Sequence, residues 1–147
     1  MAGGPFGCAT NASEAQNSCM KGLTDRTPAQ WGDLVRSASG HSGPFPILSV
    51  FHGSMDTTVD DQNMTELMEQ WTNIHNTDAM PDTDDFFHGH PHRTYNDQSG
   101  RPVVETYHIQ GMLHAVSVDP GDDEDQGGSV GAYAAYYAAL FWGLINP

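Results

Sequence analysis

The chain has 147 residues, a hydrophobic fraction of 37% and a formal net charge of −14 from 19 acidic and 5 basic side chains. That length predicts one domain, and the negative surface argues against binding to nucleic acid or to anionic membranes. The sequence has no apolar run of membrane-spanning length and no basic N-terminal region leading into an apolar stretch, so it predicts neither a membrane span nor a signal peptide.

The acidic bias falls mainly on aspartate, and Lys21 is the only lysine. Such a surface is typical of proteins from salty habitats, where ions screen the self-repulsion, and the alternative is an ordinary acidic secreted protein. The cysteines, Cys8 and Cys19, lie in a segment rich in Gly, Asn and Ser. A close, isolated pair favours a local disulfide and an oxidising compartment, whereas the alternative is two unpaired thiols in a cytosolic protein.

The first predicted helix begins at Pro28, after an irregular loop over residues 1–23. Thr27 is its expected N-cap and Gln30 completes a capping box. Gly, Ser and Pro residues at 39–44 end this helix. The apolar side chains of the helix share one face, and they are Trp31, Leu34, Val35 and Ala38.

A buried strand and a second helix follow. Residues 45–51 are almost continuously apolar and are bounded by turn residues, which favours a strand of a parallel sheet. After a turn that contains Asp56, residues 60–75 show helical periodicity. The apolar positions of this second helix are Met64, Leu67, Met68, Trp71 and Ile74.

The second half of the chain predicts a loop, a hairpin and a final helix. Residues 76–91 are acidic and rich in His and Pro, so we expect a surface loop there. Residues 92–96 and 102–109 predict a hairpin. A loop that carries His114 leads to the final helix, for which Ser129 is the expected N-cap. The wide apolar face of that helix comprises Tyr133, Tyr136, Tyr137, Leu140, Phe141 and Leu144.

This order of strands and helices is an α/β pattern, in which reactive groups lie on loops past the carboxyl ends of strands. Asp56 and His114 both occupy such a position. A carboxylate and an imidazole on neighbouring loops are the acid and the base of a serine-hydrolase triad, in which the carboxylate holds the His tautomer that accepts the serine proton. The alternative at this point is a turn-forming Asp and a surface His.

Five sequence blocks stand out along nearly the whole chain. They are residues 3–8 (GGPFGC), 27–31 (TPAQW), 52–59 (HGSMDTTV), 111–115 (GMLHA) and 141–144 (FWGL). Together, and in this order, they resemble the extracellular polyhydroxybutyrate depolymerase and feruloyl esterase group of α/β-hydrolases. The resemblance implies a partial α/β-hydrolase fold over residues 1–147, the carboxyl-terminal half of a three-layer sandwich with a few-stranded sheet and flanking helices.

By this resemblance Asp56 matches the catalytic acid and His114 the catalytic base, and Cys8 and Cys19 match a cysteine pair common in the group. Members of the family are secreted and cleave esters of polymeric or aromatic acids without a metal or organic cofactor. The resemblance therefore implies a polyester or aromatic-ester substrate, secretion and no cofactor. Leu113 departs from the small residue that is usual at its position.

The nucleophile of the family lies outside these blocks. In the family a Gly-x-Ser-x-Gly elbow, the early strands and the oxyanion loop precede the Gly-Gly-Pro segment, and this sequence begins after that point. We therefore expect a large part of the domain to be absent from this sequence. A small sheet with unpaired edges predicts a homo-oligomer, a complementing segment or a marginal fold.

Three serines inside the chain are weaker candidates for the nucleophile. Ser129 lies in a Gly-x-Ser-x-Gly string, but a charged loop precedes it where an elbow needs a strand, and it follows His114 in the chain. Ser42 lacks the final Gly of the motif, and Ser54, beside Asp56, is better explained as a turn residue. We expect the attacking serine to come from sequence other than this chain.

Two further clusters offer metal ligands. His88, His90 and His92 alternate along one segment and suit zinc, nickel or copper, although a solvated loop is the favoured interpretation. The acidic loop before the final helix offers oxygen ligands without EF-hand spacing, from Asp119, Asp122, Asp123 and Asp125. The tryptophans Trp31, Trp71 and Trp142 are expected to be core residues.

The sequence as a whole predicts a carboxylic-ester hydrolase that resembles polyhydroxybutyrate depolymerases and acts through Asp56 and His114. One alternative is a non-catalytic remnant that binds a partner or a polymer. The other is an acidic metal-binding protein that uses the three alternating histidines.

Overall fold

The computed structural model describes residues 3–38, 40–118 and 131–147, and a mixed sheet lies at its centre. Four strands lie in the order β1 (Leu48–Gly53), β4 (Pro102–Ile109), β3 (His90–Asn96) and β2 (Thr83–Phe87). β1 and β4 are parallel, and the pairs β4–β3 and β3–β2 are antiparallel. This sheet with flanking helices confirms the expected α/β class.

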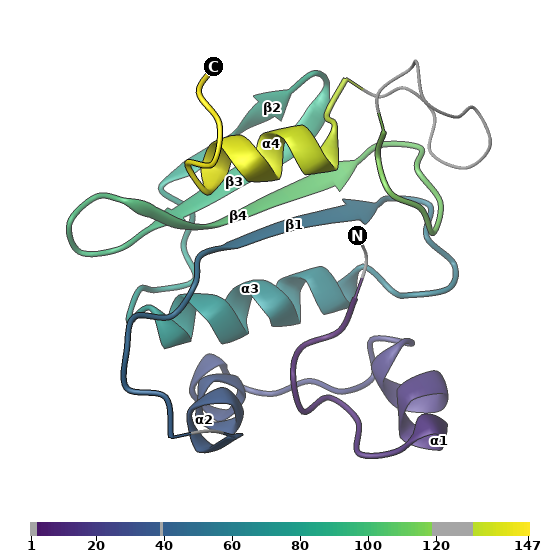
Figure 1. Cartoon of the computed structure of the whole chain (residues 1–147). Coiled ribbons are helices and arrows are strands. Elements are labelled where there is room, and N and C mark those ends of the chain that lie inside the picture. The colour runs from purple at the N-terminus through teal and green to yellow at the C-terminus, as the bar shows by residue number, and fades with distance from the viewer. Residues whose placement is uncertain (1–2, 39, 119–130) are drawn as a thin grey trace.

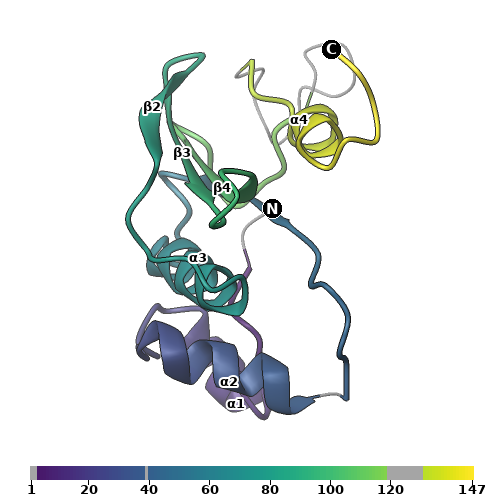
Figure 2. The ribbon, with the colours of Figure 1, turned by 90° about the vertical axis from the view of Figure 1, so that its left-hand side faces the viewer.

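Helices cover both faces of the sheet (Figure 1). α4 (Ala134–Phe141) lies on one face and α3 (Gln62–Ile74) on the other. α2 (Pro28–Ala38) packs against the far side of α3, so α3 is enclosed between a sheet and a second helical layer (Figure 2). None of the helices in the described ranges is long and apolar enough to cross a membrane.

The capping box predicted for α2 is present. The Thr27 backbone N–H donates to Gln30 Oε1 over 2.9 Å, and the Gln30 N–H donates to Thr27 Oγ1 over 3.3 Å. Trp31 is fully buried in the helical layer, against the disulfide. The helix therefore begins at the predicted residue for the predicted reason.

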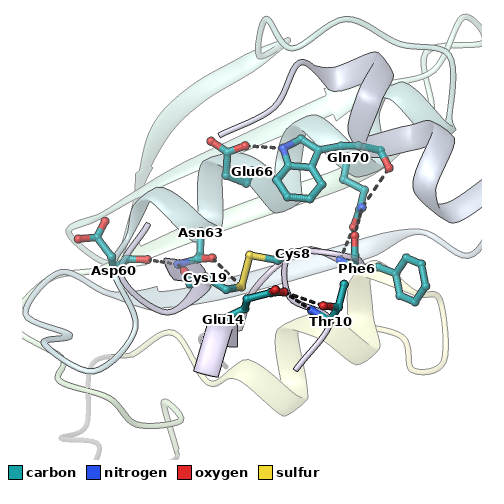
Figure 3. Close-up of a disulfide and its surroundings, with 10 residues drawn as sticks. Phe6, Cys8, Thr10, Glu14, Cys19, Asp60, Asn63, Glu66 and Gln70 are labelled. Carbon is teal, nitrogen blue, oxygen red and sulfur yellow. Dashed lines mark hydrogen bonds between the residues drawn. A yellow bond between two sulfur atoms is a disulfide. The ribbon is translucent and has the colours of Figure 1, made fainter. Parts of the chain in front are cut away.

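The two faces of α3 contact different partners. Met68 packs on one side against the sheet residues Tyr95, Val103 and Val104. On the other side, Glu66 accepts a hydrogen bond from the indole N–H of Trp31, and Gln70 binds both backbone polar groups of Phe6 at 2.9 and 3.0 Å (Figure 3). Buried polar side chains thus tie the N-terminal segment to α3, since each has a fixed partner.

The N-terminal segment is more ordered than the predicted irregular loop. It contains the short helix α1 (Ala12–Glu14) and a π-helix (Ala15–Cys19), because the Asn11 side chain accepts a hydrogen bond from Glu14 N and caps the turn. The structure joins Cys8 to Cys19 in a disulfide, and Asn63 Nδ2 donates to the Cys19 carbonyl at 2.9 Å (Figure 3).

Three other expectations were wrong. The apolar strand begins at Leu48 instead of residue 45, in accordance with the missing N–H of Pro46. The predicted loop over 76–91 contains β2 and the start of β3. α4 begins at Ala134 and its N-cap is Tyr133. The expected N-cap, Ser129, lies outside the described residues.

The core beneath α4 is built from small side chains together with Tyr137, one member of the predicted apolar face. Ala132, Ala134 and Ala138 pack on Phe51 and Tyr107, whose rings stack at 4.5 Å. Tyr136 is 44% exposed and Leu144 71% exposed. Trp142, expected in the core, is 47% exposed, whereas Trp31 is fully buried and Trp71 is half-buried against the other face of the sheet.

Candidate active site

The loops after β1 and β4 leave the same edge of the sheet, because these strands are parallel neighbours with Gly53 opposite Ile109 (Figure 1). Three hydrogen bonds join the two loops. Ser54 N donates to the Ile109 carbonyl at 2.9 Å, Met55 N donates to the Met112 carbonyl at 3.0 Å, and Gly111 N donates to Ser54 Oγ at 2.9 Å. The segment that carries Asp56 is therefore fixed to the segment that carries His114.

Gly53 makes this close approach possible. A Cβ at this position would lie 2.7 Å from the carbonyl carbon of Met112, and closer still to the carbonyl oxygens of Met112 and Leu113. Ordinary contacts of a Cβ are 3.4 to 4 Å long, so a larger residue would push the loops apart.

The carboxylate of Asp56 has no exposed surface and is fully engaged. Its Oδ1 accepts backbone hydrogen bonds from Thr58 and Val59, both at 2.9 Å. Its Oδ2 lies 2.9 Å from Nδ1 of His114. The predicted contact between Asp56 and His114 is thus present, and the turn that follows Asp56 sets the orientation of the carboxylate.

These contacts also keep Asp56 ionised. Burial raises the pKa of the carboxyl group, but the hydrogen bonds from Val59, His114 and Thr58 lower it by more, and the resulting pKa lies below its usual value. An ionised carboxylate accepts only, so the nitrogen of His114 that faces it carries a proton. Nε2 of the neutral imidazole is then the proton acceptor.

The side chain of His52 contacts the turn that follows Asp56. Its ring is completely buried, and Nε2 lies 3.0 Å from the Val59 carbonyl and 3.8 Å from Asp56 Oδ2. Because a carbonyl only accepts, Nε2 carries the proton. Burial lowers the pKa of His52 against the raising effects of the Val59 carbonyl and Asp56, so this imidazole is neutral.

His114 differs from His52 in its exposure. Its side chain is 45% exposed, while its carboxylate partner is inaccessible. A base that is held on one nitrogen by a buried carboxylate and open at the other can take a proton from a hydroxyl and return it to a leaving group. The arrangement is suited to general acid–base chemistry.

None of the hydrogen bonds of the described residues joins a candidate serine hydroxyl to Asp56 or His114. The Oγ of Ser54 accepts from Gly111 N, which agrees with its interpretation as a turn residue, and Ser42 lies on the exposed segment before β1. Ser129 lies outside the described residues. Among the hydrogen bonds of the described residues, His114 has Asp56 as its partner and no serine hydroxyl.

The alternating histidines do not converge on one point. His90 Nδ1 accepts from Gln110 N at 3.0 Å, while His92 lies between Asp85 at 3.0 Å and Glu105 at 3.5 Å. In the described part of the chain no three His, Cys, Asp or Glu side chains are grouped to hold a metal ion. The acidic candidates Asp119, Asp122, Asp123 and Asp125 lie outside the described residues.

Sequence reasoning missed His52 and Gly53 as parts of this site. Both residues lie at the end of β1, where the buried strand continues into a turn. A histidine at a buried strand position is unusual, and this feature of the sequence could have indicated a role for His52. Sequence reasoning also missed the buried Glu105, which accepts hydrogen bonds from Ser49 and Tyr107 at 2.6 and 3.2 Å on the face of the sheet beneath α4.

Comparison with known proteins gives several matches. The chain is 46% identical over 154 residues to poly(3-hydroxyalkanoate) depolymerase C of Paucimonas lemoignei, a match that covers 99% of this chain and 37% of that protein. It is 36% identical to an acetylxylan esterase of Coprinopsis cinerea over 78% of this chain and 31% of that protein. A match to feruloyl esterase B of Thermothelomyces thermophilus has 40% identity and covers 47% of this chain and 25% of that protein.

A solved structure has the same fold. The acetyl xylan esterase from Aspergillus awamori superposes with a TM-score of 0.65 at 23% identity, covering 86% of this chain and 41% of that chain. No protein-family model matches the sequence. The chain spans about a third of the length of the first two relatives named above. It is therefore a relative of the polyhydroxyalkanoate depolymerases and of the acetylxylan and feruloyl esterases, with the fold of an esterase over part of their length.

Proposed function

We propose that this chain supplies the acid–base pair of a carboxylic-ester hydrolase. The observation that carries the proposal is the 2.9 Å contact between His114 Nδ1 and the buried carboxylate of Asp56. The names of the relatives support the reaction class, since they are depolymerases of a polyester and esterases of acetylated or feruloylated substrates. The proposed substrates are therefore polyesters and aromatic or acetyl esters.

In the proposed reaction, Asp56 holds His114 with its Nε2 unprotonated. Nε2 takes the proton of a serine hydroxyl as the serine oxygen attacks the ester carbonyl, and the imidazolium then gives that proton to the departing alcohol. Water attacks the acyl-enzyme by the same route, releasing the acid and restoring the serine. Asp56 stays ionised throughout and stabilises the imidazolium.

The proposal requires a serine that the contacts of the described residues do not include. We infer that this serine comes from the part of the relatives' length that the chain does not span. β1, the strand that leads to Asp56, lies at one edge of the sheet, where a complementing strand or a second copy can add. The disulfide supports placing the protein in an oxidising, extracellular compartment.

A second candidate function is binding of a polymer or partner without turnover. It is favoured by the observation that no serine hydroxyl contacts His114 among the described residues. In that case the two loops keep their structure and the chain binds an ester-containing polymer that it does not cleave.

Turnover of p-nitrophenyl acetate, measured with this chain together with the segment that supplies the serine, distinguishes the two candidates. We expect the His114→Asn and Asp56→Asn substitutions each to lower turnover by about a hundredfold or more, whereas the His41→Asn control retains it. A fluorophosphonate label followed by peptide mapping then identifies the attacking serine. Undiminished turnover in the His114→Asn variant would refute the proposed function, and saturable binding to a polyester film with no turnover would establish the second candidate.

A further inference from the structure

A row of polar side chains crosses the sheet beneath α4, and the proposed reaction does not use it. His92 of β3 lies between two carboxylates: its Nδ1 is 3.0 Å from Asp85 Oδ1 on β2, and its Nε2 is 3.5 Å from Glu105 Oε2 on β4. The Ser49 hydroxyl of β1 donates to Glu105 Oε1 at 2.6 Å, and the Tyr107 hydroxyl donates to Oε2 at 3.2 Å. The row therefore includes a side chain from each of the four strands.

His92 is the member of this row whose charge changes near neutral pH. Burial lowers the pKa of His92, but the contacts with Glu105 and Asp85 raise it by more, and the result lies above the usual value for histidine. The ring stacks on Tyr107 with centroids 4.4 Å apart, which fixes its orientation between the carboxylates. An imidazolium in this position has two N–H donors, one for each carboxylate.

The other titratable groups around His92 do not compete for this role. Burial raises the pKa of Tyr107, and burial also raises the pKa of Tyr137 on α4, so both phenols are neutral near pH 7. His90, two positions earlier on β3, accepts a hydrogen bond from Gln110 N through its Nδ1. The charges that act on His92 are therefore those of the two carboxylates.

Loss of the His92 proton leaves one N–H donor for two carboxylates. In either tautomer of the neutral ring, one nitrogen turns a lone pair toward a carboxylate, which also only accepts. The side chain of Asp85 is 55% exposed and can turn to water, whereas that of Glu105 is 5% exposed and is held by two hydroxyls. The contact that breaks is therefore the one between His92 and Asp85.

This contact matters because β2 has little else to hold it. β2 is the edge strand opposite β1, and none of its residues is buried (Figure 1). Its last residue, Phe87, packs edge to face on Tyr137 of α4 with centroids 4.6 Å apart. At the start of α4, Ala134 N donates to the Ser117 carbonyl at 3.1 Å, three residues beyond His114. A movement of β2 thus reaches α4 and the segment that carries His114.

We propose that Asp85, His92 and Glu105 form a proton-operated latch, in which protonated His92 holds β2 and the start of α4 on the sheet and neutral His92 releases them. Opening is local, because strands with few buried contacts open before the core does. The latch itself is independent of the proposed function. Its effect on the segment that carries His114 is a regulation of the proposed site and rests on that function.

Hydrogen exchange of the parent chain at about pH 6 and about pH 8.5 tests the latch without turnover. After correction for the intrinsic pH dependence of exchange, we expect the protection of the β2 amides and of the Ala134 amide to be lower at the higher pH by about tenfold. The amides of β1 and β4 should keep their protection. Equal protection of β2 at the two pH values would overturn the proposal, and a loss at β2 without a loss at Ala134 would contradict its reach to α4.

Two neighbouring aspartates provide a matched pair of variants. Asp85→Asn should abolish the pH dependence, because an amide accepts from a protonated ring and donates to a neutral one. Asp84→Asn removes the same charge from the adjacent position, where Asp84 pairs with Arg93 at 3.2 Å on the other face of the sheet, and should keep the pH dependence. Equal behaviour of these two variants would overturn the assignment of Asp85.

His92→Gln tests the titrating group itself and should give the same protection of β2 at both pH values. A pH dependence that survives this substitution would overturn the assignment of His92. Because Asp85 is more than half exposed, the Asp85→Asn result does not depend on whether the His92→Gln variant folds. Since no step of the experiment needs ester turnover, failure of the proposed function leaves the test of the latch unaffected.

Discussion

Replacing Gly53 by alanine tests how the two loops of the candidate site are held together. The added Cβ would lie 2.7 Å from the carbonyl carbon of Met112 and closer to two carbonyl oxygens, all of them backbone atoms that no side-chain rotation can move. To restore ordinary contacts with the two carbonyl oxygens, the loop that carries His114 has to retreat by about 1 Å or more.

A retreat of this size acts on short hydrogen bonds. The contacts from Met55 N to the Met112 carbonyl and from His114 Nδ1 to Asp56 Oδ2 are 3.0 and 2.9 Å long. Lengthening them by that amount brings them to or beyond the limit of a hydrogen bond. Overpacking together with the loss of these bonds is expected to cost about 2–4 kcal/mol, which lowers the melting temperature by roughly 5–15 °C.

Amide hydrogen exchange measures the separation of the loops directly. We expect the protection of the Ser54, Met55 and Gly111 amides to fall in the Gly53→Ala variant, while the amides of α2 keep theirs. Gly40→Ala is the matched control, because a Cβ there meets nothing within 4 Å. Unchanged protection of the three amides together with a parental melting temperature would refute the reasoning.

Three further predictions concern titration and the support of the turn. Because the pKa of Asp56 is lowered in the folded state, its contribution to stability is present above about pH 3.9 and is lost as the pH falls through the folded value. In urea unfolding from pH 2 to 5, the free energy of unfolding should therefore depend less on pH in Asp56→Asn than in the parent protein. Burial lowers the pKa of His92, but Glu105 and Asp85 raise it by more, so the folded-state pKa lies above its usual value. The stabilisation by His92 is therefore present below about pH 6.5 and is lost as the pH rises through the folded value. His92→Gln should abolish this pH dependence in unfolding measured from pH 6 to 9. His52→Leu leaves the Val59 carbonyl unpaired in the interior and should lower the free energy of unfolding by about 1–3 kcal/mol, and His52→Gln, which offers a donor at a similar distance, should recover part of that loss in the same urea titration.

The predictions from sequence were correct where the residues that determine the structure lie close together in the chain. The capping box of Thr27 and Gln30 lies within one helical turn, and it set the start of α2. The strand that ends before Asp56 and the hairpin strand that ends before His114 were found from their apolar patterns. Their parallel pairing then brought the carboxylate and the imidazole together as predicted.

The predictions from sequence were wrong where a structural element depends on residues that lie far away in the chain. β2 has no buried residue and is a strand because it pairs with β3. The Asp84–Arg93 ion pair and the Asp85–His92 contact join the two strands. An acidic sequence with exposed side chains on both faces carries no periodicity that predicts such a strand.

The burial of Gln70 on α3 was not predicted, for the same reason. Gln70 is fully buried because its amide satisfies the backbone of Phe6, 64 positions away, and the carbonyl of Trp31. A glutamine in a helix sequence predicts a solvated position, and only the docked N-terminal segment makes it a core residue.

Nitrogen NMR of the His114 side chain tests the central claim most directly. If the buried carboxylate of Asp56 holds the imidazole, the neutral ring carries its proton on Nδ1 with Nε2 free, and the Asp56→Asn substitution shifts the ring toward the Nε2-protonated tautomer. A ring already protonated on Nε2 in the parent protein, or a tautomer that Asp56→Asn does not change, would contradict the account.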